Sequence, residues 1–226
     1  MMGDFWQWLF FSDAGLLARI AAGVAIFAAL AAWDICRKGK QARRWREYLF
    51  LLAAVGVALA YGLINDQITA TISWEYFFYN KEGYKALGVE TPPDMAALRI
   101  EALKVGLKAT WTVGLLFGVA VLIANNPRKD RPQLAYRRLY RLLWVPLAGA
   151  IVLAALLGLA GWLGLLDRFT DLIVVGDRPR NSLCVFSIHL GGYLGSFIGA
   201  VAVIAGILRQ RRRLKSQPVH PGRQGL

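Results

Sequence analysis

The segment that organises this chain is YGLINDQITATISWEYFFY, residues 61–79. It prolongs an apolar run that begins near Tyr48, yet it becomes densely polar from Asn65 onward, and residues 65–79 contain no glycine or proline that would end the helix. A membrane-spanning helix needs about 20 mostly apolar residues, so carboxylates near its end point to a functional site. The segment therefore predicts one continuous helix over about residues 48–76, with Asp66 and Glu75 in a candidate site at its outer end.

The composition indicates a bilayer rather than water as the solvent of this chain. Hydrophobic residues make up 57% of its 226 residues and the mean hydropathy is +0.43, which is too apolar for a soluble domain of this size. The formal net charge is +13, but Lys and Arg fall in short blocks between apolar runs. This pattern is typical of cytoplasmic loops, so the expected partners are the lipid bilayer and anionic lipids at the cytoplasmic face, and no nucleic acid.

The apolar runs predict an all-α integral membrane protein, a bundle of about five transmembrane helices. The expected spans cover about residues 14–35, 48–76, 98–124, 142–166 and 184–208. Residues 1–215 are expected to form a single transmembrane domain, and residues 216–226 a disordered cytoplasmic tail.

The positions of Lys and Arg predict the orientation of the bundle. Six of them lie in each of three segments, residues 37–46, residues 128–141 and the chain from residue 209 onward, which together hold eighteen of the 27. Lys and Arg are enriched in cytoplasmic loops. With five spans, the N-terminus is therefore expected outside and the C-terminus in the cytoplasm.

Helix geometry predicts which polar residues lie at the same depth. Counting about 20 residues outward from each cytoplasmic boundary, at 1.5 Å per residue, places Asp66, Val105 and His189 at nearly the same height. His189 and Tyr193 share a stripe on the last span. Three helices are thus expected to bring polar residues to the outer rim.

The second span carries candidate residues on two faces. Asp66, Thr69 and Ser73 share one face of a helix, whereas Glu75 is about half a circle away from Asp66. Glu75 therefore needs a bend or another partner, and its neighbour Tyr76 belongs to the same region. The candidate ligand- or ion-binding residues are Asp66, Thr69, Ser73, Glu75, Tyr76, His189 and Tyr193.

Two further features bear on the site. Lys104 and Lys108 on the third span are expected to extend to the lipid headgroups, with an ion pair to Asp66 or Glu75 as the alternative. One histidine and two carboxylates are enough in number for a metal, but no spacing here is specific for one. No metal and no other cofactor are therefore expected.

Part of the chain resembles an uncharacterised family of multi-pass bacterial membrane proteins. Residues 61–77 are similar to its motif Y-G-x-x-[HN]-D-Q-[IV]-T-x-x-[IV]-[SC]-x-E-Y-F. Two shorter pieces are also similar: Ala109-Thr110-Trp111 with Gly114 to A-T-W-W-V-G, and His189 with Tyr193 to the start of H-x-x-x-Y-x-x-G, with Gly195 one residue before the place of the family's glycine. The chain departs from the family in having Asn65 where the family has a histidine and Thr112 in place of the second tryptophan.

The resemblance implies a location and a set of residues, but no activity. It implies a multi-pass protein of the bacterial cytoplasmic (inner) membrane. It also implies that Asp66, Glu75, Tyr76 and His189 belong to one recurring constellation.

Three functions agree with these observations. We favour a non-enzymatic protein that binds or translocates a proton, a cation or a small polar solute, with Asp66 and Glu75 as the charged groups. An alternative is an intramembrane enzyme acting on a lipid headgroup, with either carboxylate as base, His189 as acid and Arg178 or Arg180 holding phosphate. A further alternative is a structural or assembly subunit, with a homo-oligomer or a membrane-complex partner left open.

Overall fold

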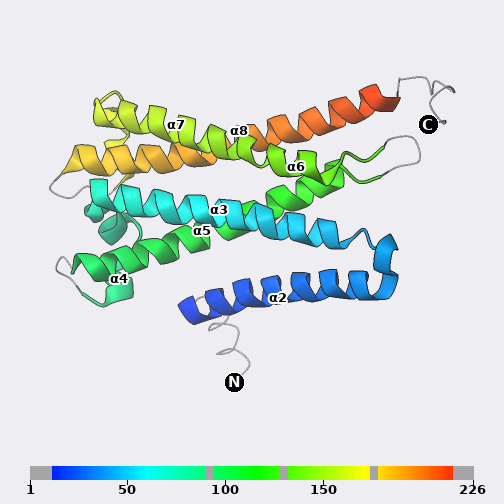
Figure 1. The fold of residues 1–226 in the computed structure, drawn as a ribbon. Coiled ribbons are helices and arrows are strands. Elements are labelled where there is room, and N and C mark those ends of the chain that lie inside the picture. The colour runs from blue at the N-terminus through cyan, green and yellow to red at the C-terminus, as the bar shows by residue number, and fades with distance from the viewer. Residues whose placement is uncertain (1–11, 90–93, 128–131, 174–177, 216–226) are drawn as a thin grey trace.

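The computed structural model describes residues 12–89, 94–127, 132–173 and 178–215, and in these ranges all of the regular secondary structure is helical (Figure 1). The elements are α2 (Asp13–Lys38), η1 (Gly39–Gln41), α3 (Trp45–Ile72), η2 (Tyr76–Asn80), α4 (Gly83–Leu87), α5 (Met95–Ala124), α6 (Tyr136–Leu142), α7 (Trp144–Trp162), η3 (Asp167–Leu172) and α8 (Pro179–Lys215). The expected tail at residues 216–226 lies outside the described residues.

Five helical segments of the described chain are long and apolar enough to cross a membrane. They are Asp13–Gln41, Trp45–Ile72, Met95–Ala124, Tyr136–Trp162 and Pro179–Leu214. The predicted all-α architecture with five long apolar helices is therefore confirmed. Successive long helices run in opposite directions (Figure 1).

The last two spans differ from the prediction at their ends. The helix expected over residues 184–208 is longer, because Pro179 fits the first turn of α8 and the Arg-, Gln- and Lys-rich end favours helix. The span expected over residues 142–166 instead begins at Tyr136 and stops earlier, before Gly164 at a φ of +77°.

The prediction of one helix over residues 48–76 is wrong. α3 ends at Ile72, and Ser73 is extended with φ −145° and ψ 105°. The Ser73 hydroxyl accepts a hydrogen bond from the Tyr76 backbone N–H at 3.3 Å, and Asn181 of α8 donates to the freed carbonyl of Ile72 at 3.0 Å. The chain then continues as η2, a turn of π-helix. Local and tertiary hydrogen bonds thus end this helix without glycine or proline.

The bundle consists of two close helix pairs, α3 with α5 and α7 with α8, which contact each other less extensively (Figure 1). Glycines let the backbones of each pair touch. A Cβ atom on Gly106 would lie 2.9 Å from the Gly62 carbonyl oxygen, and one on Gly149 would lie 2.5 Å from that of Gly195. Both distances are shorter than real Cβ contacts, so glycine is required at these crossings.

α2 packs beside α3 and is fixed at its end by a carboxylate. Asp34 is buried and accepts hydrogen bonds from the backbone N–H groups of Arg44 at 2.8 Å and Trp45 at 3.2 Å. Lys38 forms an ion pair with the same carboxylate at 3.0 Å. Asp34 therefore caps the N-terminus of α3, which has no cap of its own side chain.

The two lysines of α5 have a partner that the sequence did not indicate. Lys104 and Lys108 contact the two carboxylate oxygens of Asp13, at 2.8 Å and 2.7 Å, and Lys104 also pairs with Glu101. The ion pair to Asp66 or Glu75 that the sequence left open is not formed. The two lysines instead hold the start of α2 against α5.

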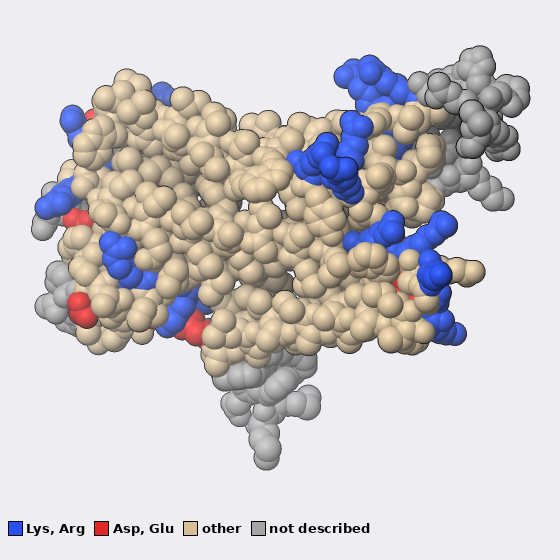
Figure 2. Space-filling view, in the orientation of Figure 1, with Lys and Arg blue, Asp and Glu red and all other residues tan. Residues whose placement is uncertain are grey.

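Most basic side chains gather at one end of the bundle, where α8 ends and α6 begins (Figure 2). One of them is buried. The Arg211 side chain donates to the carbonyls of Pro132 at 3.0 Å, Asn126 at 2.6 Å and Ala124. It thereby satisfies carbonyls at and beyond the C-terminus of α5, which the helix itself leaves unpaired.

Candidate functional site

α3 and α8 run antiparallel and meet in two polar layers. Asp66 faces His189 in one layer, and Ser73 faces Ser182 in the other. On each helix the two residues are seven apart, which is two turns or roughly 10 Å along the axis. Two buried residues of one apolar cluster lie between these positions in sequence, Ala70 on α3 and Val185 on α8.

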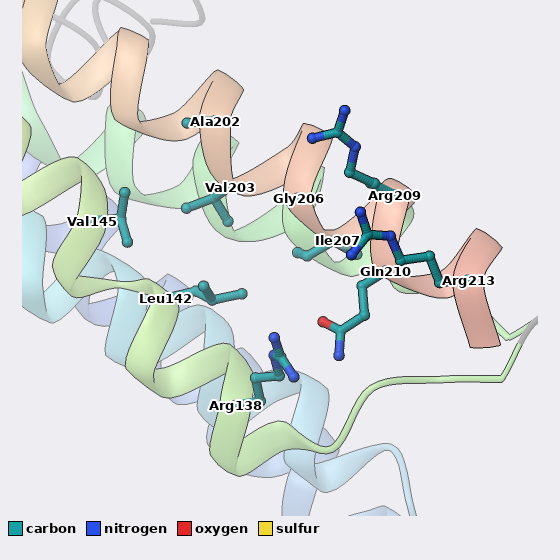
Figure 3. A pocket seen from close by; sticks show the side chains of 10 residues that line it. All are labelled: Arg138, Leu142, Val145, Ala202, Val203, Gly206, Ile207, Arg209, Gln210 and Arg213. Atoms are coloured by element: carbon teal, nitrogen blue, oxygen red, sulfur yellow. The ribbon is translucent and has the colours of Figure 1, made fainter.

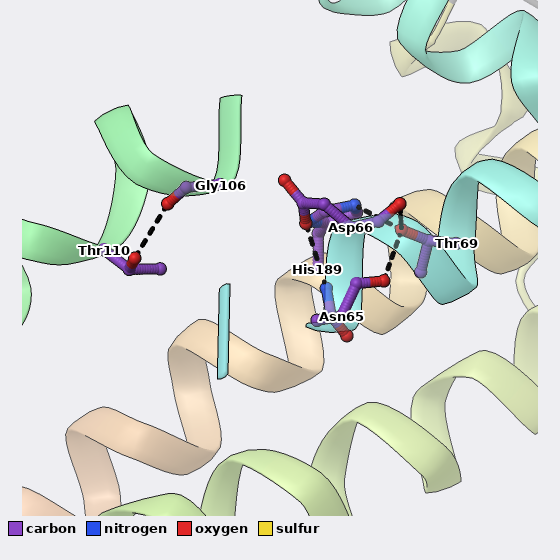
Figure 4. A network of polar contacts seen from close by, with 6 residues as sticks. All are labelled: Asn65, Asp66, Thr69, Gly106, Thr110 and His189. Atoms are coloured by element: carbon purple, nitrogen blue, oxygen red, sulfur yellow. Dashed lines mark hydrogen bonds and ion pairs between the residues drawn. The ribbon is translucent and has the colours of Figure 1, made fainter. Parts of the chain in front are cut away.

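The inner layer is formed by Asn65, Asp66 and Thr69 of α3 and by His189 of α8 (Figure 4). His189 Nδ1 lies 3.8 Å from Asp66 Oδ1, and His189 Nε2 lies 3.5 Å from Thr69 Oγ1. The same Asp66 oxygen accepts a hydrogen bond from the Asn65 side chain at 3.3 Å. Asp66 is only 3% exposed, so its carboxyl group is withdrawn from bulk solvent.

The second carboxylate oxygen of Asp66 lies against α5. A Cβ atom on Gly106 would be 3.2 Å from Asp66 Oδ2, so the absence of a side chain at this position makes room for the carboxylate. Asp66 therefore stands at the junction of three helices. The rise per residue predicted that Asp66 and His189 lie at nearly the same height, and their separation of 3.8 Å agrees with this prediction.

The hydrogen-bond pattern constrains the His189 ring. Thr69 Oγ1 has one hydrogen, which it donates to the Asn65 carbonyl at 2.8 Å, so towards His189 it acts as an acceptor. A neutral imidazole then carries its proton on Nε2 and presents a lone pair at Nδ1. That lone pair faces Asp66 at 3.8 Å, too far for a direct hydrogen bond. The gap fits a proton or cation that both groups can share.

Aromatic rings from η2 hold the imidazole in place. The Tyr76 ring stacks on His189 with centroids 5.3 Å apart and planes 15° apart, and the Phe77 ring meets it edge-on at 5.9 Å. Both rings follow the break at Ser73. The break that ends α3 is therefore what brings Tyr76 to the site, since a continuous helix would have carried it further outward.

The outer layer contains the second candidate carboxylate, Glu75. Ser73 Oγ donates to Glu75 Oε2 at 2.9 Å, and because its only hydrogen is then used, Ser182 donates to Ser73 at 3.1 Å. All three side chains are buried. The sequence left open a bend or another partner for Glu75, and both are found: Glu75 follows the break at Ser73, and Ser73 is its partner. Glu75 belongs to a layer separate from Asp66.

A cavity of about 650 Å³ lies between the two helix pairs. Its walls are mostly apolar, and Asp66, His189 and Tyr193 line it together with Tyr61 and Asn65. Thr69, Ser73, Glu75 and Tyr76 do not line it. The volume is in the range of small-ligand sites, and the polar groups gather in one part of the wall.

The cavity opens sideways between the helix pairs. Tyr193, Leu194 and Phe197 of α8 line it and are 46%, 43% and 68% exposed. Gaps between the side chains in the middle of the molecule are visible in Figure 2. Tyr193 therefore lies at the open wall of the cavity, one turn from His189, and not in the buried polar layers.

A lysine beyond the spans influences the site. Burial lowers the pKa of the Lys81 amine, and the charge of Asp66 opposes this shift. The amine lies 5.5 Å from the centre of the Tyr76 ring, and burial raises the pKa of the Tyr76 hydroxyl. The sequence did not point to Lys81, because the contact between η2 and α8 depends on tertiary packing.

Two other residues were missed. The Tyr61 hydroxyl is buried and has no hydrogen-bond partner among the described residues, and a Cβ on Gly192 would lie 2.5 Å from it. Ser182 completes the outer layer. Helical spacing could have indicated both residues, because residues seven or eight apart share a face of a helix. Tyr61 is eight residues from Thr69, and Ser182 is seven residues from His189.

The described residues hold no group of three or more His, Cys, Asp or Glu side chains that could bind a metal ion. The inner layer offers one carboxylate, one imidazole and neutral oxygens. This set can exchange a proton or bind the N–H groups of an organic cation, whose apolar part the cavity walls can accommodate.

The chain was compared with protein-family models, with curated proteins and with solved structures. None of the three comparisons finds a significant match.

Proposed function

We propose that this chain is a multi-pass protein of a bacterial cytoplasmic membrane that binds a small organic cation, or a proton, between Asp66 and His189. Its N-terminus lies outside and its C-terminus in the cytoplasm. The gathering of basic side chains at one end supports this orientation. The resemblance of residues 61–77 to a bacterial membrane family supports the location.

The observation that carries the proposal is the gap between Asp66 and His189, which face each other without a direct hydrogen bond. A buried carboxylate needs a proton, a cation or strong donors to compensate its charge. Asp66 receives one side-chain hydrogen bond, of 3.3 Å, and faces the imidazole across 3.8 Å. A ligand with an N–H group supplies the missing donor, and the apolar walls of the cavity favour an organic cation over a hydrated metal ion.

Binding is better supported than conduction along the helix axis. The two polar layers are roughly 10 Å apart. Ala70 and Val185 are buried, 1% and 0% exposed, at the intermediate positions of α3 and α8. No hydrogen bond links Glu75 to Asp66 among the described residues. The described side chains therefore form no continuous hydrogen-bonded path between the two carboxylates.

The alternative function, an enzyme that acts on a phosphate-bearing lipid headgroup, has less support. No Lys or Arg lines the described cavity. Arg178 and Arg180 are exposed, and Arg180 lies nine residues from His189 on α8, about 13 Å along the helix. A lipid phosphate in the cavity would therefore lack a cationic partner.

The proposal is tested by infrared difference spectroscopy of the protein in nanodiscs. Small alkylammonium ions, sodium, potassium and a pH step are added in turn, and the carboxyl bands are recorded. We expect alkylammonium ions to perturb a band that is absent from Asp66→Asn. The exposed Glu82, paired with Lys85 at 2.8 Å, gives the matched control Glu82→Gln, which keeps the band.

Two outcomes decide against the proposal. If neither a cation nor a pH step perturbs the Asp66 band, the site binds no cation or proton. If the perturbation survives in Asp66→Asn, it arises at another carboxylate. A response to the pH step alone assigns the site to a proton instead of an organic cation.

A further inference from the structure

A second cavity lies at the basic end of the bundle, between α6 and the start of α7 on one side and α8 on the other. Its volume is about 470 Å³. Figure 3 shows guanidinium groups from Arg138, Arg209 and Arg213 around one part of it and apolar side chains around the other. It is separate from the Asp66 site in position and in chemistry.

The three arginines that line the cavity come from two helices. Arg209 and Arg213 are one turn apart on the same face of α8, and Arg138 lies across from them on α6 (Figure 3). All three are exposed, and none has an ion pair or hydrogen bond to a residue that the structure describes. They differ in this from the neighbouring Arg211, which is buried against backbone carbonyls.

The rest of the cavity wall is apolar. Leu142 and Val145 face it from α6 and α7, and Val203 faces it from α8. On both sides the apolar residues lie toward the middle of the bundle and the arginines toward its end. The cavity therefore changes from apolar to cationic in the same direction as a bilayer changes from acyl chain to headgroup.

We propose that this cavity binds an anionic phospholipid of the cytoplasmic leaflet. Its phosphate groups contact Arg138, Arg209 and Arg213, because guanidinium groups bind phosphate oxygens in paired hydrogen bonds. Its acyl chain lies against Leu142 and Val145. Basic pockets between membrane helices on the cytoplasmic side are suited to such headgroups. Three guanidinium groups favour a lipid with two phosphates over one with a single phosphate.

The site can be tested by native mass spectrometry of the full chain in detergent. Cardiolipin, phosphatidylglycerol and phosphatidylcholine are added in equal amounts, and the retained lipid is measured. The variant Arg138→Gln/Arg209→Gln/Arg213→Gln removes three charges from the site. The matched control Arg43→Gln/Arg137→Gln/Arg141→Gln removes three charges from exposed arginines that do not line the cavity.

We expect the wild type to retain cardiolipin most strongly and phosphatidylcholine least. A basic residue near anionic lipid contributes about fivefold in binding, so the site variant loses about a hundredfold in cardiolipin affinity. The control keeps most of the wild-type affinity. Equal losses in the two triple variants would mean general attraction to a basic surface and would overturn the proposal.

Gly206 provides a test that leaves every charge in place. It lines the cavity, and a Cβ atom added there would meet no other atom within 4 Å. Gly206→Leu therefore adds an apolar side chain at the cavity wall, starting from a Cβ that meets no neighbour, and it replaces glycine by a better helix former. We expect this variant to fold and to lose cardiolipin retention about tenfold, by exclusion of the acyl chain.

Soluble anions separate a lipid site from a phosphate site. Inorganic phosphate and glycerol phosphate are added as competitors at concentrations equal to that of the lipid. We expect neither to displace cardiolipin, because they lack the apolar part. If glycerol phosphate competes fully and Gly206→Leu changes nothing, the arginines bind a soluble anion and the proposal is wrong.

Discussion

The buried polar groups at the two ends of the bundle differ in how completely they are hydrogen-bonded. At the basic end, Asn125 makes two hydrogen bonds to the backbone of Leu134, at 3.1 Å and 2.8 Å, and Arg211 donates to three carbonyls. At the other end, Asp66 receives one hydrogen bond of 3.3 Å, and the Tyr61 hydroxyl has no partner among the described residues. Fully bonded buried groups stabilise a fold, whereas incompletely bonded ones are candidates for a functional role.

The largest expected effect is the loss of stability on replacing Arg211. Arg211→Met keeps much of the side-chain volume but leaves buried carbonyls without donors, which costs about 3 kcal/mol. The measurement is the unfolding free energy in mild detergent. Arg137→Met, at an exposed position of α6, is the control and changes stability by at most about 0.5 kcal/mol. Equal effects of the two substitutions would show that Arg211 acts only as a surface charge.

A smaller loss of stability is expected at Asn125. Asn125→Ala removes both hydrogen bonds to Leu134 and costs about 2 kcal/mol, because a buried N–H and a buried carbonyl lose their partners. Asn126→Ala is the control, since its side chain is exposed and its backbone carbonyl still accepts from Arg211. Unfolding in detergent, followed by circular dichroism, compares the two. If Asn126→Ala is the more damaging change, the two-bond contact is not what stabilises this end.

The opposite behaviour is expected at Asp66. Asp66→Asn keeps the size of the side chain and removes its charge, so we expect a change in stability within about 1 kcal/mol together with loss of cation binding. Thermal unfolding with and without an alkylammonium ligand measures both effects in one experiment. A large loss of stability with unchanged binding would place Asp66 with the structural groups of the basic end.

The smallest effect is a pH dependence that Lys81 contributes. Burial lowers the pKa of this amine from its ordinary value of 10.5, so the unfolded chain binds more protons than the folded one between the two pKa values. Stability therefore rises as the pH approaches 10.5, because the unfavourable burial of a charged amine is relieved. Lys81→Met lacks this rise. The measurement is the unfolding midpoint of both proteins from neutral to alkaline pH, and parallel curves would contradict the assignment.

The long helices could be predicted because each is a property of a local run of residues. Five apolar stretches of sufficient length give five candidate spans, and the rise per residue places Asp66 and His189 at one height. Their contact distance of 3.8 Å agrees with that estimate. Each residue adds the same rise along the helix axis, so the length of a helix and the depth of a residue follow from counting residues in the sequence.

The break after Ile72 could not be predicted in the same way. It depends on Asn181, more than a hundred residues away, whose side chain takes the carbonyl that the helix releases. The pairing of Lys104 with Asp13 depends likewise on where α2 packs. Tyr76 reaches His189 only because of the break. The parts of the site that escaped prediction are those that depend on contacts between distant segments.

The two helix pairs are tied to each other at both ends, by Arg211 to the carbonyls after α5 and by Asn181 and Ser182 to the segment after α3. The cavity between the helix pairs is therefore bounded at both ends of the bundle by these contacts and has a lateral opening. In the membrane location that we propose, a molecule that enters by this lateral opening must first dissolve in the bilayer. The relevant concentration of a ligand for the Asp66 site is then its concentration per lipid, and affinities measured in membranes will follow the partition coefficient of each compound as well as its fit.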